Sequence, residues 1–233
     1  MTNKSIDDAT RLLEGAYALR TASDSIDYYR EFADLYDRDY ADRMGYIYPA
    51  MLAAIYKQYA GIGDTPVADI GCGTGLVAEA LKSVDPTMNP TIEIEIDGID
   101  ISTEMLDKAR SKNLYRDLLQ ADLTETTSAL PTNYGCIVSA GTFTFGHLGP
   151  HLLPEILRLG KSETLYCIGV NSVYYEEQGF SRILNAMVEN GQISPPTANV
   201  RKIYDKPNDL LNHDNANNSH ATDTATVLVY RQR

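Results

Sequence analysis

The sequence predicts an α/β protein built on a mostly parallel, doubly wound sheet with helices on both faces. Two observations carry this prediction. Apolar, strand-like runs alternate with helix-like segments from residue 67 to about residue 190, which is the pattern of successive βαβ units. The first of these runs ends in a glycine-rich turn that spans residues 71–75, and such a turn joins a buried parallel strand to the helix that follows it.

Composition limits the possible functions. The chain has 233 residues, 43% of them hydrophobic and 22% charged, which suits one sizeable soluble domain. It has no apolar run long enough to span a membrane and no secretory signal at its N-terminus, so a cytoplasmic protein without a membrane partner is expected. A net charge of −12 disfavours nucleic acid as a partner, because phosphate backbones repel an acidic surface. Oligomeric state is left open.

The first 60 residues are expected to form helices that cap the domain formed by residues 61–233. Apolar residues at helical spacing predict one helix over residues 6–19 and a second that places Tyr29, Phe32, Tyr36 and Tyr40 on one face. A third helix follows Pro49 and ends near residue 61.

The core elements then follow in order. Strands are expected at residues 67–71, 94–101, 118–121, 136–140 and 164–170. Helices are expected at residues 76–84, after the N-cap Ser102, at residues 150–159, and around residues 180–187. Residues 200–204 and 226–230 are strand-like with no clear helix between them, so they are expected to pair antiparallel at the sheet edge. The polar segment between them, residues 205–223, is longer than an ordinary loop, which predicts a functional or disordered segment.

The glycine turn favours an adenosine-containing cofactor other than a dinucleotide. Dinucleotide enzymes carry Gly-x-Gly-x-x-Gly, but here Leu76 stands at the third position and the third glycine is Gly75. Asp69 precedes the turn and suits a cationic amino group better than a pyrophosphate. Asp100 ends the second strand, where a carboxylate accepts from ribose hydroxyls, and Asp122 follows the third strand, where it accepts from an adenine amino group.

Together these segments resemble the class I S-adenosylmethionine-dependent methyltransferases over residues 28–233. Residues 36–46 and 139–147 are also similar to the Williams-Beuren-region methyltransferase-like group. The resemblance implies a seven-stranded sheet of order 3-2-1-4-5-7-6 with an antiparallel last hairpin, and S-adenosylmethionine as cofactor with S-adenosylhomocysteine as product. It also implies a cofactor site formed by Asp69, Gly71, Cys72, Gly73, Gly75, Asp100, Ile101, Asp122, Leu123 and Ser139.

The methyl acceptor is expected to be a small molecule, with oxygen favoured over nitrogen or sulfur. Enzymes that methylate exocyclic or side-chain amide nitrogens carry an Asn/Asp-Pro-Pro-aromatic motif after the fourth strand, whereas residues 139–143 here read Ser-Ala-Gly-Thr-Phe. The candidate catalytic residues are His147, as a general base, and Tyr40. Tyrosines concentrate before residue 60, and residues 24–48 are expected to form a lid over the methyl donor. The acceptor and lid candidates are Tyr28, Tyr29, Tyr36, Tyr46, Phe143 and Asn171.

Two other functions stay open as alternatives. A regulatory or sensor module would bind S-adenosylmethionine without transferring its methyl group. A nicotinamide-dependent dehydrogenase is disfavoured by Leu76, because its turn requires glycine there. No metal site is expected, because Cys72, Cys136 and Cys167 lack metal-ligand spacing.

Overall fold

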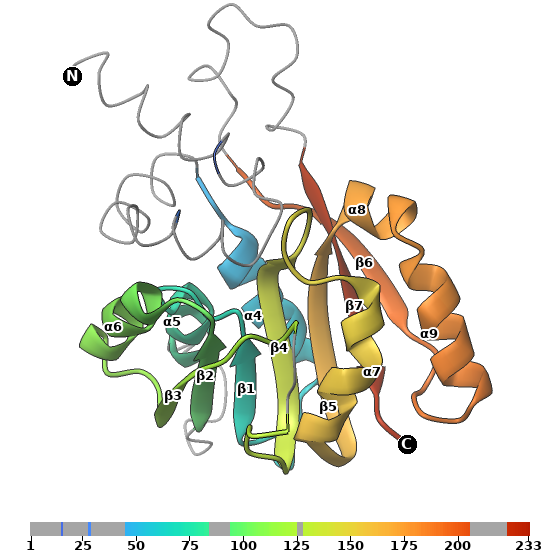
Figure 1. Cartoon of the computed structure of the whole chain (residues 1–233), viewed down its shortest axis with the longest axis horizontal. Helices are drawn as coiled ribbons and strands as arrows, with labels where there is room; N and C mark the ends of the chain where they lie inside the picture. Colours follow the sequence, from blue (N-terminus) through green and yellow to red (C-terminus); the bar gives the residue numbers. More distant parts are fainter. Residues whose placement is uncertain (1–14, 16–27, 29–44, 84–93, 125–127, 206–222) are drawn as a thin grey trace, which may run out of the picture.

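The protein is a single seven-stranded sheet covered by helices on both faces. The computed structural model describes residues 15, 28, 45–83, 94–124, 128–205 and 223–233. The strand order is β3-β2-β1-β4-β5-β7-β6, and the sheet runs across the molecule in Figure 1. The strands are β1 (Val67–Ile70), β2 (Ile96–Asp100), β3 (Asp117–Gln120), β4 (Tyr134–Phe143), β5 (Gly160–Asn171), β6 (Thr197–Lys202) and β7 (Thr224–Arg231).

Strand direction confirms the predicted doubly wound topology. Strands β3, β2, β1, β4 and β5 run parallel to one another. Strand β7 is antiparallel to both β5 and β6, which makes the last hairpin antiparallel. Because these five strands point in the same direction, their carboxyl ends all lie at one edge of the sheet. Proteins with α/β sheets bind their ligands at this edge.

Helices cover both faces because alternate strand residues are apolar on each side. The helices are α4 (Tyr48–Tyr59), α5 (Leu76–Lys82), α6 (Thr103–Ser111), α7 (Leu153–Ile156), α8 (Ser172–Glu177) and α9 (Phe180–Glu189). One buried cluster joins α4 and α5 to Val67 and Val138. The second joins α7 and α9 to Ala68 and Ile137. Neighbouring residues of β1 and of β4 thus enter opposite cores, as the two-residue period of a strand requires.

The capping prediction at Ser102 is confirmed, whereas the helix predicted over residues 150–159 is wrong as a single element. The Ser102 hydroxyl accepts a 3.2 Å hydrogen bond from the Met105 N–H at the start of α6. Residues 150–159 instead form a 3₁₀ turn (Pro150–Leu152), the short α7, and another 3₁₀ turn (Leu157–Leu159). The proline at position 154 lacks the N–H that a continuous helix starting at Pro150 would need in its interior, whereas Pro150 itself stands in the first turn, where proline is tolerated.

Strand boundaries also differ from the predicted ones. Strands β4 and β5 extend beyond the apolar runs that predict them, because backbone pairing with a neighbour does not require an apolar side chain. Strand β6 begins and ends earlier than predicted, and Tyr204 instead forms an isolated antiparallel bridge with Tyr46. This bridge joins the segment just before α4 to the segment that follows β6.

Apart from residues 15 and 28, the helix predicted over residues 6–19 and the second predicted helix, which carries Tyr29 and Tyr40, lie outside the described residues, as does most of the segment 205–223. Within the described part of the chain, no helix is both long and apolar enough to cross a membrane.

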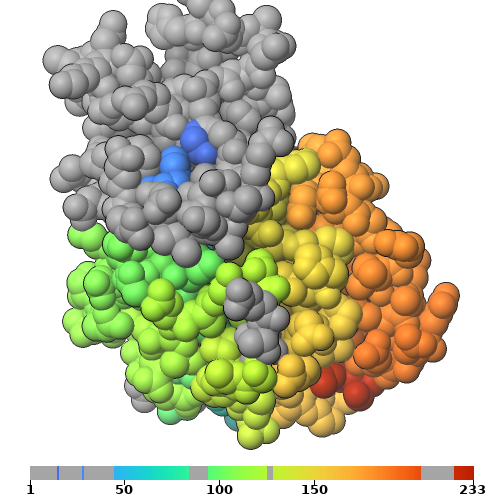
Figure 2. Space-filling model, in the orientation of Figure 1, coloured from blue at the N-terminus to red at the C-terminus, as the bar shows by residue number. Residues whose placement is uncertain are grey.

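The C-terminal strand is fastened to the start of β1 by an ion pair. The Arg231 guanidinium donates to both carboxylate oxygens of Asp64, at 2.8 and 2.9 Å, and also to the Glu163 carbonyl oxygen at 2.8 Å. The red C-terminal residues emerge beside the yellow-to-orange surface in Figure 2. This fastening lies at the opposite end of the strands from the glycine-rich turn.

Candidate functional site

A pocket opens at the carboxyl ends of β1, β2, β3 and β4. Segments 71–74, 99–101, 121–124 and 140–142 line it, together with residues 146–148 and two residues beside the start of α4, Tyr46 and Pro49. It encloses about 1050 Å³ of space, part of which is open to solvent. It lies where the strand order reverses between β1 and β4, the position at which open α/β sheets bind their ligands.

The turn after β1 forms one wall of this pocket. Gly71 and Gly73 have φ values of 66° and 52°, in the left-handed region that favours glycine. A Cβ at Gly71 would overlap the Thr142 side chain, whereas a Cβ at Gly73 would meet no atom within 4 Å. Gly73 therefore leaves room beside the turn, and α5 begins directly after it with its N-terminal N–H groups at this end.

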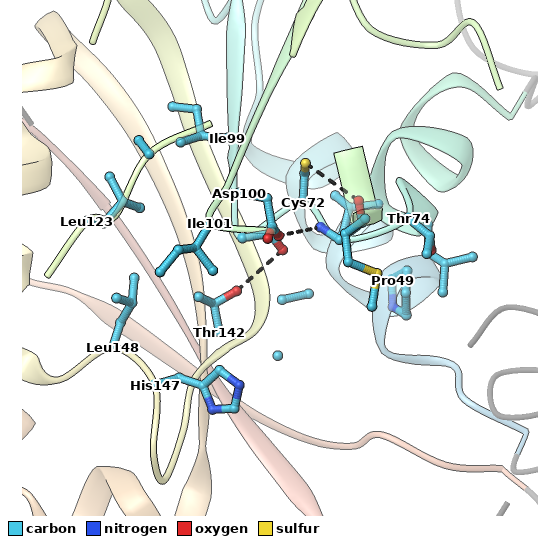
Figure 3. A pocket seen from close by; sticks show the side chains of 18 of the residues that line it. Pro49, Cys72, Thr74, Ile99, Asp100, Ile101, Leu123, Thr142, His147 and Leu148 are labelled. Carbon is cyan, nitrogen blue, oxygen red and sulfur yellow. Dashed lines mark hydrogen bonds between the residues drawn. The ribbon is translucent and has the colours of Figure 1, made fainter. Parts of the chain in front are cut away.

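Asp100 holds a fixed carboxylate in the middle of the pocket. Its Oδ2 accepts from the Gly73 N–H at 2.8 Å, and its Oδ1 accepts from the Ser102 N–H at 2.9 Å. Burial raises the pKa of Asp100, and these backbone hydrogen bonds oppose the rise. Figure 3 shows the carboxylate between the glycine turn and Ile101. Each oxygen keeps further lone-pair capacity, so the group can accept from a ligand hydroxyl.

The two sides of the pocket differ in polarity. Figure 3 shows Ile99, Ile101, Leu123 and Leu148 on one side of Asp100, with Cys72, Thr74 and Pro49 on the other. The apolar side suits a planar ring. Asp122 also lines the pocket, and its Oδ1 accepts from both the N–H and the hydroxyl of Thr124, at 2.8 and 2.6 Å.

Three of the predicted cofactor residues do not line the pocket. Asp69 and Ser139 are fully buried beneath it. The Tyr115 hydroxyl donates to Asp69 at 2.7 Å, and Ser139 donates to the Ile70 carbonyl oxygen at 2.8 Å. Gly75 is the N-cap of α5. The other seven predicted cofactor residues, which all line the pocket, are Gly71, Cys72, Gly73, Asp100, Ile101, Asp122 and Leu123.

His147 lines the pocket with one ring nitrogen already fixed. Its Nδ1 lies 3.0 Å from the Phe145 carbonyl oxygen. Because a carbonyl only accepts, the neutral ring carries its proton on Nδ1, and Nε2 is the nitrogen able to take a proton. Burial lowers the pKa of His147, while the Phe145 carbonyl and the Asp100 charge oppose this effect. The ring is therefore neutral at pH 7.

The predicted acceptor residues separate into different environments. Tyr46 lines the pocket. Phe143 is fully buried and packs against Phe180 at 6.3 Å between ring centroids. Asn171 caps α8 by accepting from the Tyr174 N–H at 3.1 Å.

The remaining tyrosines predicted for the lid lie mostly outside the described residues. Tyr28 is partly buried against the core that contains α4. Tyr29, Tyr36 and the catalytic candidate Tyr40 lie outside the part of the chain that the structure describes.

The sequence predictions missed several residues that shape the site. Thr142, Thr74, Met105 and Leu148 line the pocket, and Tyr115 lies beneath it against Asp69. Thr142 belongs to the segment that resembles the Williams-Beuren group, residues 139–147, and Leu148 directly follows it. That resemblance was therefore a signal that could have indicated both residues. Tyr115 is 46 residues from Asp69 in the chain, and no local sequence pattern predicts that the two residues are in contact. Among the described residues, no group of three or more potential metal ligands gathers.

Comparison with known proteins finds one matching domain family. Residues 67–162 match a methyltransferase domain family. No curated protein matches the chain. Among solved structures, a TehB-like S-adenosylmethionine-dependent methyltransferase from Corynebacterium glutamicum is similar, with 18% identity and a TM-score of 0.54, over 89% of this chain and 97% of the other.

Two further structures have the same fold. The plantazolicin methyltransferase BpumL, solved with a monoazolic desmethylPZN analogue and SAH, is 16% identical with a TM-score of 0.56, over 99% of this chain and all of the other. A putative S-adenosyl-L-methionine-dependent methyltransferase from Methanococcus maripaludis is 18% identical with a TM-score of 0.53, over 87% of this chain and 91% of the other. At such identities the likeness establishes the fold, and the Williams-Beuren assignment stays a prediction.

Proposed function

On the premise that this chain is a class I S-adenosylmethionine-dependent methyltransferase, we propose that it methylates a small molecule, with oxygen as the accepting atom. The observation that carries the proposal is the pocket itself. The fixed carboxylate of Asp100 and the glycine turn lie on one side, and the neutral imidazole of His147 lines the same cavity.

The residues of the pocket fit the proposed cofactor. Asp100 is placed to accept from ribose hydroxyls. The apolar side formed by Ile101 and Leu123 is suited to the adenine ring, with Asp122 at its edge. The space beside Gly73 is suited to the methionine end. When bound, the cofactor supplies a methyl group on a positively charged sulfur, which is open to in-line attack.

The acceptor end of the pocket supports a small molecule. Tyr46 and Pro49 lie at the start of α4, and Gly141 and Thr142 close the end of β4. These residues leave a partly enclosed cavity rather than an open groove. The net charge of −12 disfavours a polynucleotide acceptor. Tyr46 belongs to the proposed lid, residues 24–48, and among the few described residues of that segment it lines the pocket, which supports the lid.

A neutral histidine favours an acceptor hydroxyl. A hydroxyl is protonated at neutral pH and must lose its proton as the new bond forms, so it benefits from a base. Nε2 of His147 is the ring nitrogen that can take this proton, because Nδ1 donates to the Phe145 carbonyl. The chain thus offers a proton acceptor in the same cavity as the proposed methyl donor.

The test is a turnover assay with an unbiased acceptor pool. The purified protein is incubated with S-adenosylmethionine and, in separate reactions, with small-metabolite, protein and nucleic-acid fractions. We expect the small metabolites to yield S-adenosylhomocysteine together with a product heavier by one methylene unit. Mass spectrometry identifies the product, and fragmentation locates the new methyl group. Methylation only of protein or nucleic-acid fractions, or a product methylated on nitrogen or sulfur, would contradict the corresponding part of the proposal.

Replacing Gly73 with alanine tests the proposed position of the methionine end. The added methyl meets no protein atom within 4 Å, so we expect it to take up space that the ligand needs and to weaken S-adenosylhomocysteine binding about tenfold, or ~1.4 kcal/mol. The positive φ of 52° adds a stability cost of about 1 kcal/mol. Isothermal titration calorimetry and urea unfolding measure the two effects separately.

Gly191→Ala is the matched control for this substitution. Gly191 also has a positive φ, 70°, and a Cβ there also meets nothing within 4 Å, but it follows α9 and does not line the pocket. We expect a similar loss of stability with unchanged affinity. Equal affinities for the two variants would place the methionine end elsewhere.

A further inference from the structure

Tyr115 lies beneath the glycine turn and contacts it from below. Its hydroxyl donates a 2.7 Å hydrogen bond to Oδ2 of Asp69. Its ring packs closely under the turn, because a Cβ at either Gly75 or Gly98 would come within 3.0 Å of it. The tyrosine thus occupies the space between β1, β2 and the start of α5, and its hydroxyl is held at one carboxylate oxygen.

The other oxygen of Asp69 has no hydrogen-bond partner among the described residues. Asp69 is fully buried, and its Oδ1 is a buried acceptor without a donor. An unsatisfied buried acceptor is costly, and more so when it is charged. Asp69 lies two residues before Gly71, which lines the pocket. The carboxylate therefore belongs to the strand that leads into the turn proposed for the methionine end.

Among the residues that the structure describes, the titratable groups around Asp69 are acidic or neutral. They are the Asp100 carboxylate from β2, the Cys72 thiol from the turn, and the Tyr115 hydroxyl from the segment before β3, while His147 faces Asp100 from the segment after β4. Burial raises the pKa of Asp69 to about 7, the Tyr115 hydrogen bond opposes the rise, and the Asp100 charge adds to it. Burial also raises the pKa of Tyr115, which keeps its hydroxyl protonated as a donor.

We propose that Tyr115 is a positioning residue for methyl-donor binding: its hydroxyl orients Asp69 and holds it ionised beneath the cationic methionine end of S-adenosylmethionine. A carboxylate in a poorly solvated site attracts a nearby ammonium or sulfonium much more strongly than it would in water. The described residues supply no cation to Asp69, and the cofactor supplies one. This inference rests on the proposed position of the methionine end at the glycine turn.

Tyr115→Phe removes the hydroxyl and keeps the ring. We predict its effect on the affinity for S-adenosylmethionine as a function of pH, between pH 5.5 and 9. Calorimetry measures this affinity, because the chain has no tryptophan whose fluorescence could report binding. In the wild type, affinity rises as Asp69 ionises near pH 7. In the variant we expect this rise to move upward by about one pH unit, because a hydrogen bond to a charged group is lost. Binding at pH 7 is then about tenfold weaker at most, and the difference disappears at high pH.

Tyr134→Phe is the matched control. The Tyr134 hydroxyl donates to a buried aspartate, Asp97, at 2.8 Å, and neither residue lines the pocket. We expect this variant to lose stability without moving the pH midpoint of binding. The α-amino group of the cofactor titrates near pH 8, but it does so equally with every variant, so only differences from the wild type are compared.

Asp69→Asn keeps the test decisive if the phenylalanine variant does not fold. An amide does not ionise, so we expect the rise in affinity near pH 7 to vanish while Tyr115 stays in place. An unchanged midpoint in Tyr115→Phe, or an unchanged profile in Asp69→Asn, would overturn the role of Tyr115. Failure of the wild type to bind S-adenosylmethionine would instead overturn the proposed cofactor site, so the two failures are distinguishable.

Discussion

Replacing His147 with glutamine is expected to lower kcat for methyl transfer roughly 10²–10⁴-fold, the usual contribution of a general base. Glutamine has similar reach and hydrogen-bonding capacity but takes no proton. Because burial lowers the pKa of His147 below its ordinary value of 6.5, the wild-type rate is at its maximum at neutral pH and falls only as the pH drops through that lowered pKa. The glutamine variant is expected to lose this acid limb. Steady-state kinetics from pH 5 to 8 measure both effects.

His151→Gln is the matched control. His151 lies four residues further along the chain, is exposed and does not line the pocket. We expect its kcat and pH profile to equal those of the wild type. If His147→Gln kept its kcat and changed only KM, His147 would be a residue of ligand binding rather than the base, and the acceptor would not need deprotonation.

Replacing Asp100 with asparagine is expected to weaken S-adenosylhomocysteine binding about 100-fold, or ~3 kcal/mol. The carboxylate accepts from the Gly73 N–H and the Ser102 N–H, so it fixes the turn while it offers lone pairs to the ribose. An amide keeps the shape but replaces one acceptor by a donor and removes the charge. The new amide NH₂ then faces either a backbone N–H, which is also a donor, or a ribose hydroxyl that the carboxylate would have accepted from. Calorimetry with S-adenosylhomocysteine measures the loss.

Asp107→Asn serves as its control, because Asp107 is an exposed residue of α6 that pairs with Arg110. We expect its affinity to be unchanged and its stability to stay within about 0.5 kcal/mol of the wild type. Thermal unfolding of Asp100→Asn shows whether its loss of affinity accompanies a loss of fold. A folded Asp100→Asn protein with wild-type affinity would remove Asp100 from the proposed ribose site.

The predicted fold was confirmed because its signals are local. Apolar runs alternating with helix-like segments predicted the parallel strands, and Ser102 predicted its own helix start, since a cap depends on residues three positions apart. Boundaries were less accurate. The proline at position 154 interrupted the helix predicted at residues 150–159, and backbone pairing extended β4 and β5 past their apolar runs. Neither effect changes the strand order, which was predicted from the family resemblance and which the structure confirms.

By itself, the sequence determined that this chain has a doubly wound sheet with a glycine turn and a carboxylate at the ends of neighbouring strands, the pattern that led to the methyl-donor prediction. These features are set by short segments whose residues act through their own backbone. Only the tertiary structure decided which side chains meet. His147 lines the pocket, whereas Phe143 is buried in the core and Asn171 is the N-cap of α8. Tyr115 contacts Asp69, from which it is separated by 46 residues in the chain. Such contacts depend on how separate elements pack, and no local pattern encodes them.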